Sequence, residues 1–138
     1  MGRIVYHGTF EDKAPHEYAQ PTFHAGTRKA SEDRLAEAEE VGGVATIHAY
    51  EIKDKAPTSR QNWDDPLDHW NPVPEHRTGR IYPYTNINED EGSTSYVIPS
   101  RFVGNHVRYL GPQFQELRGE GGRVIKDAIT VMAGGKLQ

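Results

Sequence analysis

The sequence predicts an α+β fold: a mainly antiparallel, split β-sheet with one or two short helices and long loops. Short apolar and β-branched segments recur along the 138 residues, and most of them are not separated by helical patterns, which argues against a parallel βαβ arrangement. The 14 glycines and 9 prolines indicate that turns and loops take up much of the chain. Because the strands are short and the connections long, we expect the sheet to split or curve around a cleft.

Local pattern predicts five or six short strands and one or two helices. Apolar and β-branched residues predict strands at 3–6, 22–25, 44–52, 80–87, 94–99 and 102–110. A helix is predicted at 28–40, where Thr27 or Ser31 can cap the first turn and Gly42 follows the end. A second short helix is predicted at 123–133, because its apolar residues repeat at helical spacing.

The remaining segments are predicted to be irregular. Residues 54–79 are rich in proline and carry both tryptophans, and a loop this long in a small domain indicates a functional or mobile segment. Residues 111–122 are polar and glycine-rich, and residues 134–138 form a tail that we expect to be flexible. A chain of this length supports one hydrophobic core, so residues 1–138 are predicted to form a single domain.

Composition excludes several classes of protein. Without cysteine the chain has neither disulfides nor thiolate zinc sites. No apolar run approaches the ~20 residues that span a bilayer, and residues 1–6 lack the apolar stretch of a signal peptide. We therefore expect a soluble protein without a membrane partner, located in the cytoplasm of a bacterium or host cell or carried in a virion.

Charge is distributed unevenly along the chain. The net charge of −4 argues against nonspecific nucleic-acid binding as the main activity, although residues 92–138 carry more basic than acidic side chains. Scattered, solvated charges are one interpretation. The other is a basic strip that faces a phosphate-bearing ligand, because the Arg guanidinium pairs well with phosphate oxygens. Such a strip would consist of Arg101, Arg108, Arg118 and Arg123.

The first strand ends in residues suited to ligand binding. In Tyr-His-Gly-Thr at 6–9, His7 offers a donor or acceptor to a sugar hydroxyl, and Gly8 exposes its backbone to a flat amide. Thr9 adds a hydroxyl. The structural alternative is an ordinary turn, in which His and Gly are common.

A second strand end follows fifteen residues later. In Thr-Phe-His-Ala-Gly-Thr at 22–27, Phe23 and His24 point to opposite sides of the strand, so one faces the core and the other a cleft. The structural alternative is a core aromatic. The closeness of the two motifs in the sequence favours a shared site.

A third segment joins two predicted strands through an acidic turn. Within residues 84–99, Glu89, Asp90 and Glu91 precede the strand that contains Ser95. One interpretation is a solvated turn; the other is a carboxylate that orients a sugar hydroxyl at the edge of a cleft. Elsewhere, His69 and His76 follow several aspartates, but at a spacing too loose for a metal site, so we expect no metal.

Together the three motifs resemble ADP-ribosyltransferases of the His-Tyr-Glu type. Residues 6–9 look like the first motif of that family, and residues 23–31 look like the second, in which a strand with a stacking aromatic leads into a helix. Residues 84–98 resemble the late strand pair of ADP-ribosyltransferase-like domains in phage proteins. The resemblance covers about residues 3–110 and implies the family's split antiparallel sheet with an NAD site.

The resemblance implies roles for the matching residues. His7 would hold the ribose of NAD, Gly8 would bind the nicotinamide carboxamide through its backbone, and Thr9 would lie toward the adenosine. Phe23 matches the family's stacking tyrosine without its hydroxyl, and the neighbouring His24 completes this part of the candidate NAD-binding set.

The final glutamate of the family is replaced. Ser95 occupies its strand position and joins the candidate NAD-binding residues, and Glu89 and Glu91 are the nearest acids, so these two and His7 are the candidate catalytic residues. Cleavage of the bond between nicotinamide and ribose builds an oxocarbenium-like centre. The leaving group is already cationic, so the protein must supply positioning and a carboxylate near the 2′-hydroxyl.

The resemblance therefore implies a mono-ADP-ribosyltransferase that uses NAD as a substrate and modifies a macromolecule, with a protein acceptor favoured over a nucleic acid. Two alternatives stay open. Ser95 at the acid position fits a module of the same fold that has lost catalysis and has a structural or host-interaction role in a phage. An RNA 2′-phosphotransferase shares the His-Gly-Thr tripeptide, but the acidic balance of residues 1–91 disfavours it.

Overall fold

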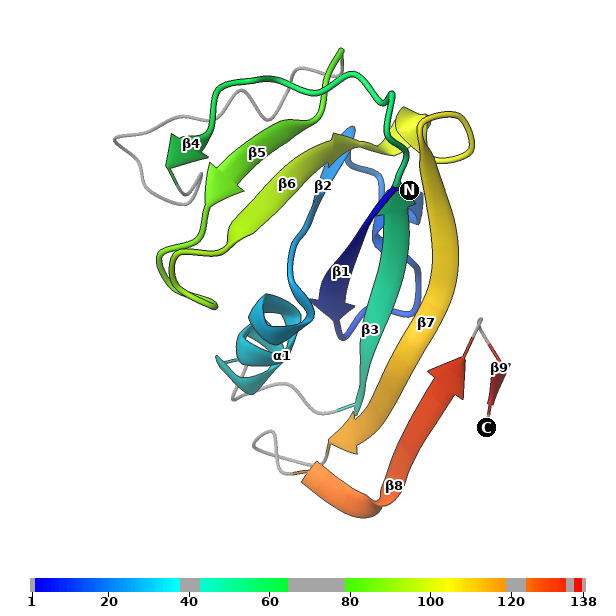
Figure 1. Cartoon of the computed structure of the whole chain (residues 1–138). Helices are drawn as coiled ribbons and strands as arrows, with labels where there is room; N and C mark the ends of the chain where they lie inside the picture. Colours follow the sequence, from blue (N-terminus) through cyan, green and yellow to red (C-terminus); the bar gives the residue numbers. More distant parts are fainter. Residues whose placement is uncertain (1, 38–42, 65–78, 119–123, 134–135, 138) are drawn as a thin grey trace.

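The computed structural model describes residues 2–37, 43–64, 79–118, 124–133 and 136–137. The described strands are β1 (Arg3–Thr9), β2 (Thr22–Ala25), β3 (Gly43–Ile52), β4 (Trp63–Asp64), β5 (Tyr82–Thr85), β6 (Thr94–Pro99), β7 (Val107–Arg118), β8 (Val124–Ala133) and β9 (Lys136–Leu137). The described helices are α1 (Arg28–Glu37) and the single 3-10 turns η1 (Pro15–Glu17) and η2 (Ser100–Phe102). These strands form two sheets, and α1 packs beside the larger one (Figure 1).

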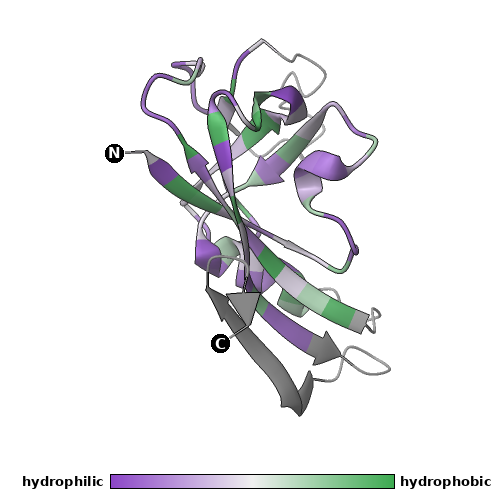
Figure 2. Ribbon diagram, turned by 90° about the vertical axis from the view of Figure 1, so that its right-hand side faces the viewer, coloured by the Kyte–Doolittle hydropathy of each residue, from purple (hydrophilic) through white to green (hydrophobic). Residues whose placement is uncertain are grey.

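The larger sheet has the strand order β1-β3-β7-β8-β9, and all of its neighbours are antiparallel. Its second strand, β3, is buried on both faces. On one face Ala45 and Ile47 pack against Leu35 of α1, and on the other Tyr50 packs against Phe23 of β2. Apolar and hydrophilic bands alternate along the strands in Figure 2, as the two-residue period of a strand requires.

The smaller sheet has the strand order β2-β6-β5-β4. Strands β2, β6 and β5 pair antiparallel, whereas the two-residue β4 lies parallel to β5. The two sheets meet at one isolated antiparallel bridge, between Tyr6 of β1 and Gly26 just after β2. Beyond that bridge the edges of β1 and β2 separate.

The helix α1 begins directly after this junction. Thr27 caps it, because the Thr27 hydroxyl accepts a hydrogen bond from the N–H of Ala30 at 3.0 Å. Ala30, Ser31 and Leu35 form its buried side. The helix lies so close to β1 that a Cβ on Gly8 would come within 2.8 Å of the Ser31 carbonyl oxygen and the Leu35 Cγ. None of the helices in the described part of the chain is long and apolar enough to cross a membrane.

The main core lies between the two sheets. It is built from apolar and aromatic side chains of both, and its most buried members include Val5, Phe23, Tyr50, Ile81, Ile98, Phe102 and Val107. A group of histidines and tyrosines borders it: His48 contacts the Tyr109 hydroxyl at 2.7 Å, and His16 contacts the Tyr50 hydroxyl at 2.7 Å. The contact region of the two sheets is therefore apolar at its centre and hydrogen-bonded along one side.

The predicted α+β class agrees with the observed architecture of mostly antiparallel strands and one α-helix. The strands predicted at 22–25 and 94–99 match β2 and β6. Strand β1 is longer than predicted and continues through His7, Gly8 and Thr9.

Several predictions for the C-terminal part were wrong. Residues 123–133, predicted as a helix, contain the strand β8, which pairs with β7. The polar segment 111–122, predicted to be irregular, contains the second half of β7, which starts at Val107 and not at Phe102. Within the predicted tail, Lys136–Leu137 forms β9 beside β8. Most of the predicted 54–79 loop, including Trp70, lies outside the described residues.

Candidate functional site

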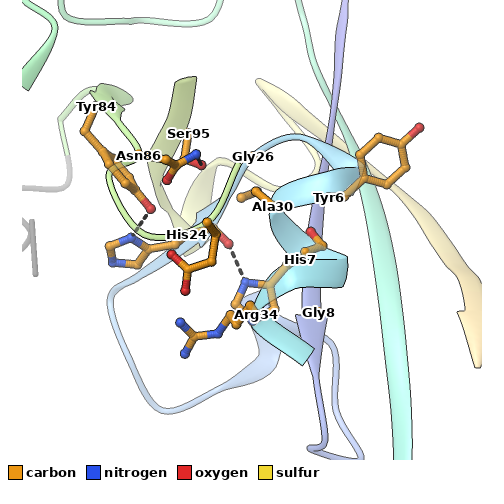
Figure 3. Close-up of a pocket in the computed structure, with 13 residues that line it drawn as sticks. Tyr6, His7, Gly8, His24, Gly26, Ala30, Arg34, Tyr84, Asn86 and Ser95 are labelled. Atoms are coloured by element: carbon orange, nitrogen blue, oxygen red, sulfur yellow. Dashed lines mark hydrogen bonds between the residues drawn. The ribbon is translucent and has the colours of Figure 1, made fainter. Parts of the chain in front are cut away.

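The candidate site lies where β1 and β2 separate. At the bridge, the Tyr6 N–H donates to the Gly26 carbonyl at 2.7 Å, and the Gly26 N–H donates to the Tyr6 carbonyl at 2.8 Å. One residue further along β1, the link between the two strands is made by the His7 ring, whose Nδ1–H donates to the His24 backbone carbonyl of β2 (Figure 3). At this position a side chain, and not a backbone N–H, makes the hydrogen bond between β1 and β2.

His7 is a neutral imidazole. Burial lowers its pKa to about 3, and the positive charge of Arg34 adds to this effect, outweighing the hydrogen bond to the His24 carbonyl, which raises the pKa. Because a carbonyl can only accept, Nδ1 carries the single ring proton. The other nitrogen, Nε2, is therefore a lone-pair acceptor, suited to a hydroxyl donor on a ligand.

A cavity of about 180 Å³ opens beside His7. Its walls come from β1, β2, α1, β5, β6 and the turn between β5 and β6, and the lining residues are Tyr6, His7, Gly8, His24, Ala25, Gly26, Ala30, Ser31, Arg34, Tyr84, Asn86, Glu89 and Ser95. Segments that are far apart in sequence therefore meet at one hollow, which is a general property of ligand sites.

The backbone of Gly8 is turned toward this cavity side. In an antiparallel strand, alternate residues direct both backbone polar groups to the same neighbour. Since Tyr6 bonds to Gly26, Gly8, two residues on, directs its N–H and C=O toward β2 and away from β3. At that level the His24 carbonyl accepts from the His7 ring. The absence of a side chain at Gly8 allows α1 to pack closely against β1. This packing role of Gly8 was not predicted from the sequence.

His24 faces the cavity while its neighbour Phe23 faces the core. The His24 Nδ1 lies 2.9 Å from the Tyr84 hydroxyl, and the two rings meet edge to face at 5.5 Å (Figure 3). Phe23 is only 3% exposed and its ring packs at a tilt against Tyr50, with the centroids 4.7 Å apart, so it cannot serve as a stacking aromatic in this cavity. The two-residue alternation of a strand allows just one of the pair to line the site.

Ser95 is held in the cavity wall by Asn86. The Asn86 side-chain amide donates to the Ser95 and Ser93 hydroxyls, each at 2.8 Å, and both Asn86 and Ser95 are 4% exposed. A Cβ on Gly26 would lie 2.0 Å from the Ser95 Oγ. The hydroxyl thus occupies the space that the glycine leaves open.

The acidic turn contributes one carboxylate to the cavity. Glu89 lines it, whereas Glu91, two residues away, is exposed and does not. Asp90, between them, bonds to α1 through the Thr27 hydroxyl at 2.6 Å. Of the two acids predicted from the sequence, the structure therefore brings Glu89 to the site.

Thr9 is, with Phe23 and Glu91, the third predicted residue that does not line the cavity. It is 8% exposed, and its hydroxyl contacts the Tyr18 hydroxyl at 2.7 Å and accepts from the Glu11 N–H at 3.0 Å. Its role in the structure is to join β1 to the loop that follows.

Sequence reasoning missed Arg34, Tyr84 and Asn86 as site residues. Arg34 lies on α1 with its guanidinium exposed at the rim of the cavity (Figure 3). One signal could have found it: Arg34 follows Ala30 by four residues, which places both on one side of a helix that leaves the second motif. Tyr84 lies in β5 and Asn86 is the first residue after it. Their spacing of two within the predicted strand 80–87 would have placed both on one face.

The predicted basic strip does not gather at this cavity. Arg108 pairs with Glu51 at 3.2 Å, and Arg101 lies over the Phe102 ring at 5.0 Å. Arg123 and the side chain of Arg118 lie outside the described part of the structure. Within the described residues, no three His, Asp or Glu side chains cluster as a metal site would require.

Comparison of the chain with protein-family models, with curated proteins and with solved structures gave no match.

Proposed function

We propose that the cavity binds the nicotinamide end of NAD and that the protein transfers ADP-ribose from NAD to a macromolecular acceptor. One observation carries the proposal: His7, the Gly8 backbone and Glu89 converge on one cavity at the split between the sheets. These are the residues for which the resemblance to His-Tyr-Glu ADP-ribosyltransferases implies a role at the reacting bond. The family's split sheet is part of the same proposal, supported by the isolated bridge between β1 and β2.

The shape and polarity of the cavity suit a flat carboxamide ring. A volume of about 180 Å³ admits a single heteroaromatic ring but not a whole dinucleotide, so the rest of NAD would extend out of the mouth. The Gly8 N–H and C=O would pair with the carboxamide oxygen and nitrogen. Arg34 at the rim would face the diphosphate, because a guanidinium binds phosphate oxygens well.

The reaction needs little proton transfer from the protein. The bond between the nicotinamide nitrogen and ribose C1′ breaks, and its electron pair goes to the ring nitrogen, so the cationic ring leaves as neutral nicotinamide. The acceptor's nucleophilic atom then bonds to C1′ and loses its proton. Glu89 would orient the 2′-hydroxyl and stabilise the positive charge on the ribose, and the His7 Nε2 would accept from a ribose hydroxyl.

The test measures NAD binding by calorimetry and nicotinamide release by chromatography. We expect Glu89→Gln to lower nicotinamide release about 100-fold or more with little change in the dissociation constant, because the lost charge acts on the transition state. His7→Ala should weaken both binding and release. Glu91→Gln is the matched control, the same substitution two residues away outside the cavity, and should behave as wild type.

A wild-type protein that neither binds NAD nor releases nicotinamide, with and without an acceptor-rich lysate, would overturn the proposal. So would equal effects of the Glu89 and Glu91 substitutions.

A second candidate function is NAD binding without turnover. The buried, hydrogen-bonded Ser95 at the strand position of the family's acid favours it. It predicts calorimetric heat for NAD in the wild type but no nicotinamide release under any condition.

A further inference from the structure

The turn that carries Glu89 is a rigid unit. Residues 86–93 are closed by backbone bonds from Asn86 N–H to the Ser93 carbonyl, from Gly92 N–H to the Asn86 carbonyl and from Ser93 N–H to the Asp90 carbonyl, each at 2.9 Å. At its base the Asn86 side chain bonds to two serine hydroxyls of the following segment. A displacement of the turn would therefore move Glu89 with it.

The tip of this turn is fastened to α1 by two reciprocal hydrogen bonds. The Thr27 hydroxyl donates to the Asp90 Oδ2 at 2.6 Å, and the Asp90 N–H donates to the Asp33 Oδ2 at 3.0 Å. Thr27 caps the start of α1 and Asp33 lies in its second turn, and the same helix lines the cavity through Ala30, Ser31 and Arg34. The contact thus joins two walls of one cavity.

Asp90 adopts an unusual backbone conformation to make these bonds. Its φ of 42° makes it the one non-glycine residue with positive φ among those described. Asp tolerates this left-handed region better than most residues, but at a cost, and such costs are retained where surrounding contacts fix the conformation. The carboxylate and the N–H of the same residue both reach the helix only because the chain turns in this way.

The neighbouring charges support the contact. A hydrogen bond from Lys29 at 2.9 Å, together with the Asp90 N–H, holds the pKa of Asp33 below its usual range. Asp33 is therefore an ionised acceptor at neutral pH.

We propose that Asp90 is a positioning residue: its bonds to Thr27 and Asp33 fix the 86–93 turn against α1 and thereby set the place of Glu89 in the cavity wall. This inference rests on the proposed function for the role of Glu89. The bonded contact between the turn and the helix is independent of it.

The test compares Thr27→Val and Asp90→Ala with two conservative variants. Asp90→Ala removes the carboxylate and leaves the Thr27 cap of α1 in place, so it is the decisive variant. Thr27→Val keeps the shape but removes both the donor to Asp90 and the cap. Thr27→Ser keeps a donor, and Asp90→Asn keeps an amide oxygen acceptor together with tolerance for positive φ. Asn88→Ala, an exposed substitution in the same turn, is the control.

Two readouts are needed. The first is amide hydrogen exchange over residues 86–93, where we expect faster exchange in Thr27→Val and Asp90→Ala and near wild-type exchange in Thr27→Ser, Asp90→Asn and Asn88→Ala. The second is steady-state nicotinamide release, where the two disruptive variants should lower kcat about tenfold with KM changed less than about threefold, since a misplaced Glu89 affects the transition state more than binding. In the double variant, exchange over residues 86–93 should be no faster than in Asp90→Ala alone, because Asp90→Ala already breaks the bond between Thr27 and the turn.

The outcomes separate the two proposals. Unchanged exchange and unchanged kcat in both disruptive variants would overturn the positioning role while leaving the proposed function in place. A wild type without nicotinamide release would overturn the proposed function, and the exchange data would then decide whether Asp90 fixes the turn. Equal losses in the disruptive and the conservative variants would also count against the inference, because they would indicate general destabilisation.

Discussion

Gly26 is the residue at which the two sheets are able to meet. Its backbone bonds to Tyr6 on one side, and the Ser95 hydroxyl occupies the place of its missing side chain on the other. Any side chain at this position would displace Ser95 and, through it, the Asn86 amide. Both neighbours are buried, so neither can move into solvent.

Gly26→Ala should therefore destabilise the fold by about 1–3 kcal/mol, the usual range for a buried overpacked position. Urea unfolding followed by tryptophan fluorescence measures it. Gly79→Ala is the matched control: nothing lies within 4 Å of a Cβ there, so its unfolding midpoint should equal that of wild type or rise slightly. Equal midpoints for the two variants would contradict the described contact with Ser95.

At the residue scale, the sequence identified part of the site. His7, Gly8, His24, Glu89 and Ser95 were singled out from short motifs at strand ends, and all five line the cavity. Which of two adjacent side chains faces a cavity depends on the strand's register and on the shape of a turn, and neither is visible in a motif of a few residues.

At the scale of elements, α1 does more than cover the larger sheet. It places Arg34 at the rim of the cavity, while Lys29 on the same helix is paired with Asp33 at 2.9 Å. The Arg34 charge also helps to keep His7 neutral. One helix therefore supplies both the positive rim and part of the cavity wall.

Arg34→Gln should weaken NAD binding about tenfold, since a charge-assisted hydrogen bond to phosphate contributes roughly this much. Binding of nicotinamide riboside, which carries no phosphate, should stay the same. Arg28→Gln is the control, because Arg28 lies on the same helix with its guanidinium over the Phe114 ring, 5.9 Å from the centroid, and does not line the cavity. Calorimetric titration of both ligands into the three proteins decides the matter; an equal loss for both ligands would exclude a phosphate contact.

Strand β8 is the element whose type was predicted wrongly from the sequence. Its valines, isoleucines and alanine recur at three and four residues, which fits a helix, but β-branched side chains favour a strand. Pairing with β7 decides between the two. The strand in this region was predicted to end at residue 110 because residues 111–122 are glycine-rich and polar. Gly111 has a φ of 90° beside an irregularity in the β3–β7 register, so the glycine marks a bulge and not the end of the strand.

At the scale of the whole molecule, the contact region of the sheets contains titratable rings that are buried in their neutral form. Burial lowers the pKa of His7 to about 3 and that of His48 to about 4, and it raises the pKa of Tyr109 to about 12. The Nε2 of His48 has no hydrogen-bond partner among the described residues, so a second proton would leave the charged ring poorly solvated.

Stability should therefore fall on both sides of neutral pH. Below about pH 6.5, His7 and His48 bind protons in the unfolded chain but stay neutral in the folded protein. The free energy of unfolding therefore decreases as the pH falls from about 6.5 toward their folded pKa values. Above about pH 10 unfolded tyrosine loses protons that folded Tyr50 and Tyr109 keep, so stability is lost again as the pH rises.

Urea midpoints measured from pH 4 to pH 11 check this. His48→Gln should reduce the slope on the acid side and leave the slope on the alkaline side unchanged. An unaltered acid slope would show that His48 does not contribute to this pH dependence.

The general architecture was accessible from the sequence because it follows from local patterns. Alternation, β-branched residues and one capped helix were enough for α+β with mainly antiparallel strands. The division of the strands into two sheets and the order within each depend on pairings between distant segments, such as β1 with β3 and β2 with β6. Those pairings are set by packing of the whole chain, for which a single sequence has no local signal.

The isolated bridge between Tyr6 and Gly26 makes this junction a natural hinge between the two sheets. At this junction the two sheets are joined by two backbone hydrogen bonds and by the hydrogen bond from the His7 ring. A ligand that binds both Gly8 in the larger sheet and His24 in the smaller one would add further links between the sheets beside this bridge. Filling the cavity would then stiffen the whole protein, and the slowed exchange of the Tyr6 and Gly26 amides would report occupancy before any chemistry takes place.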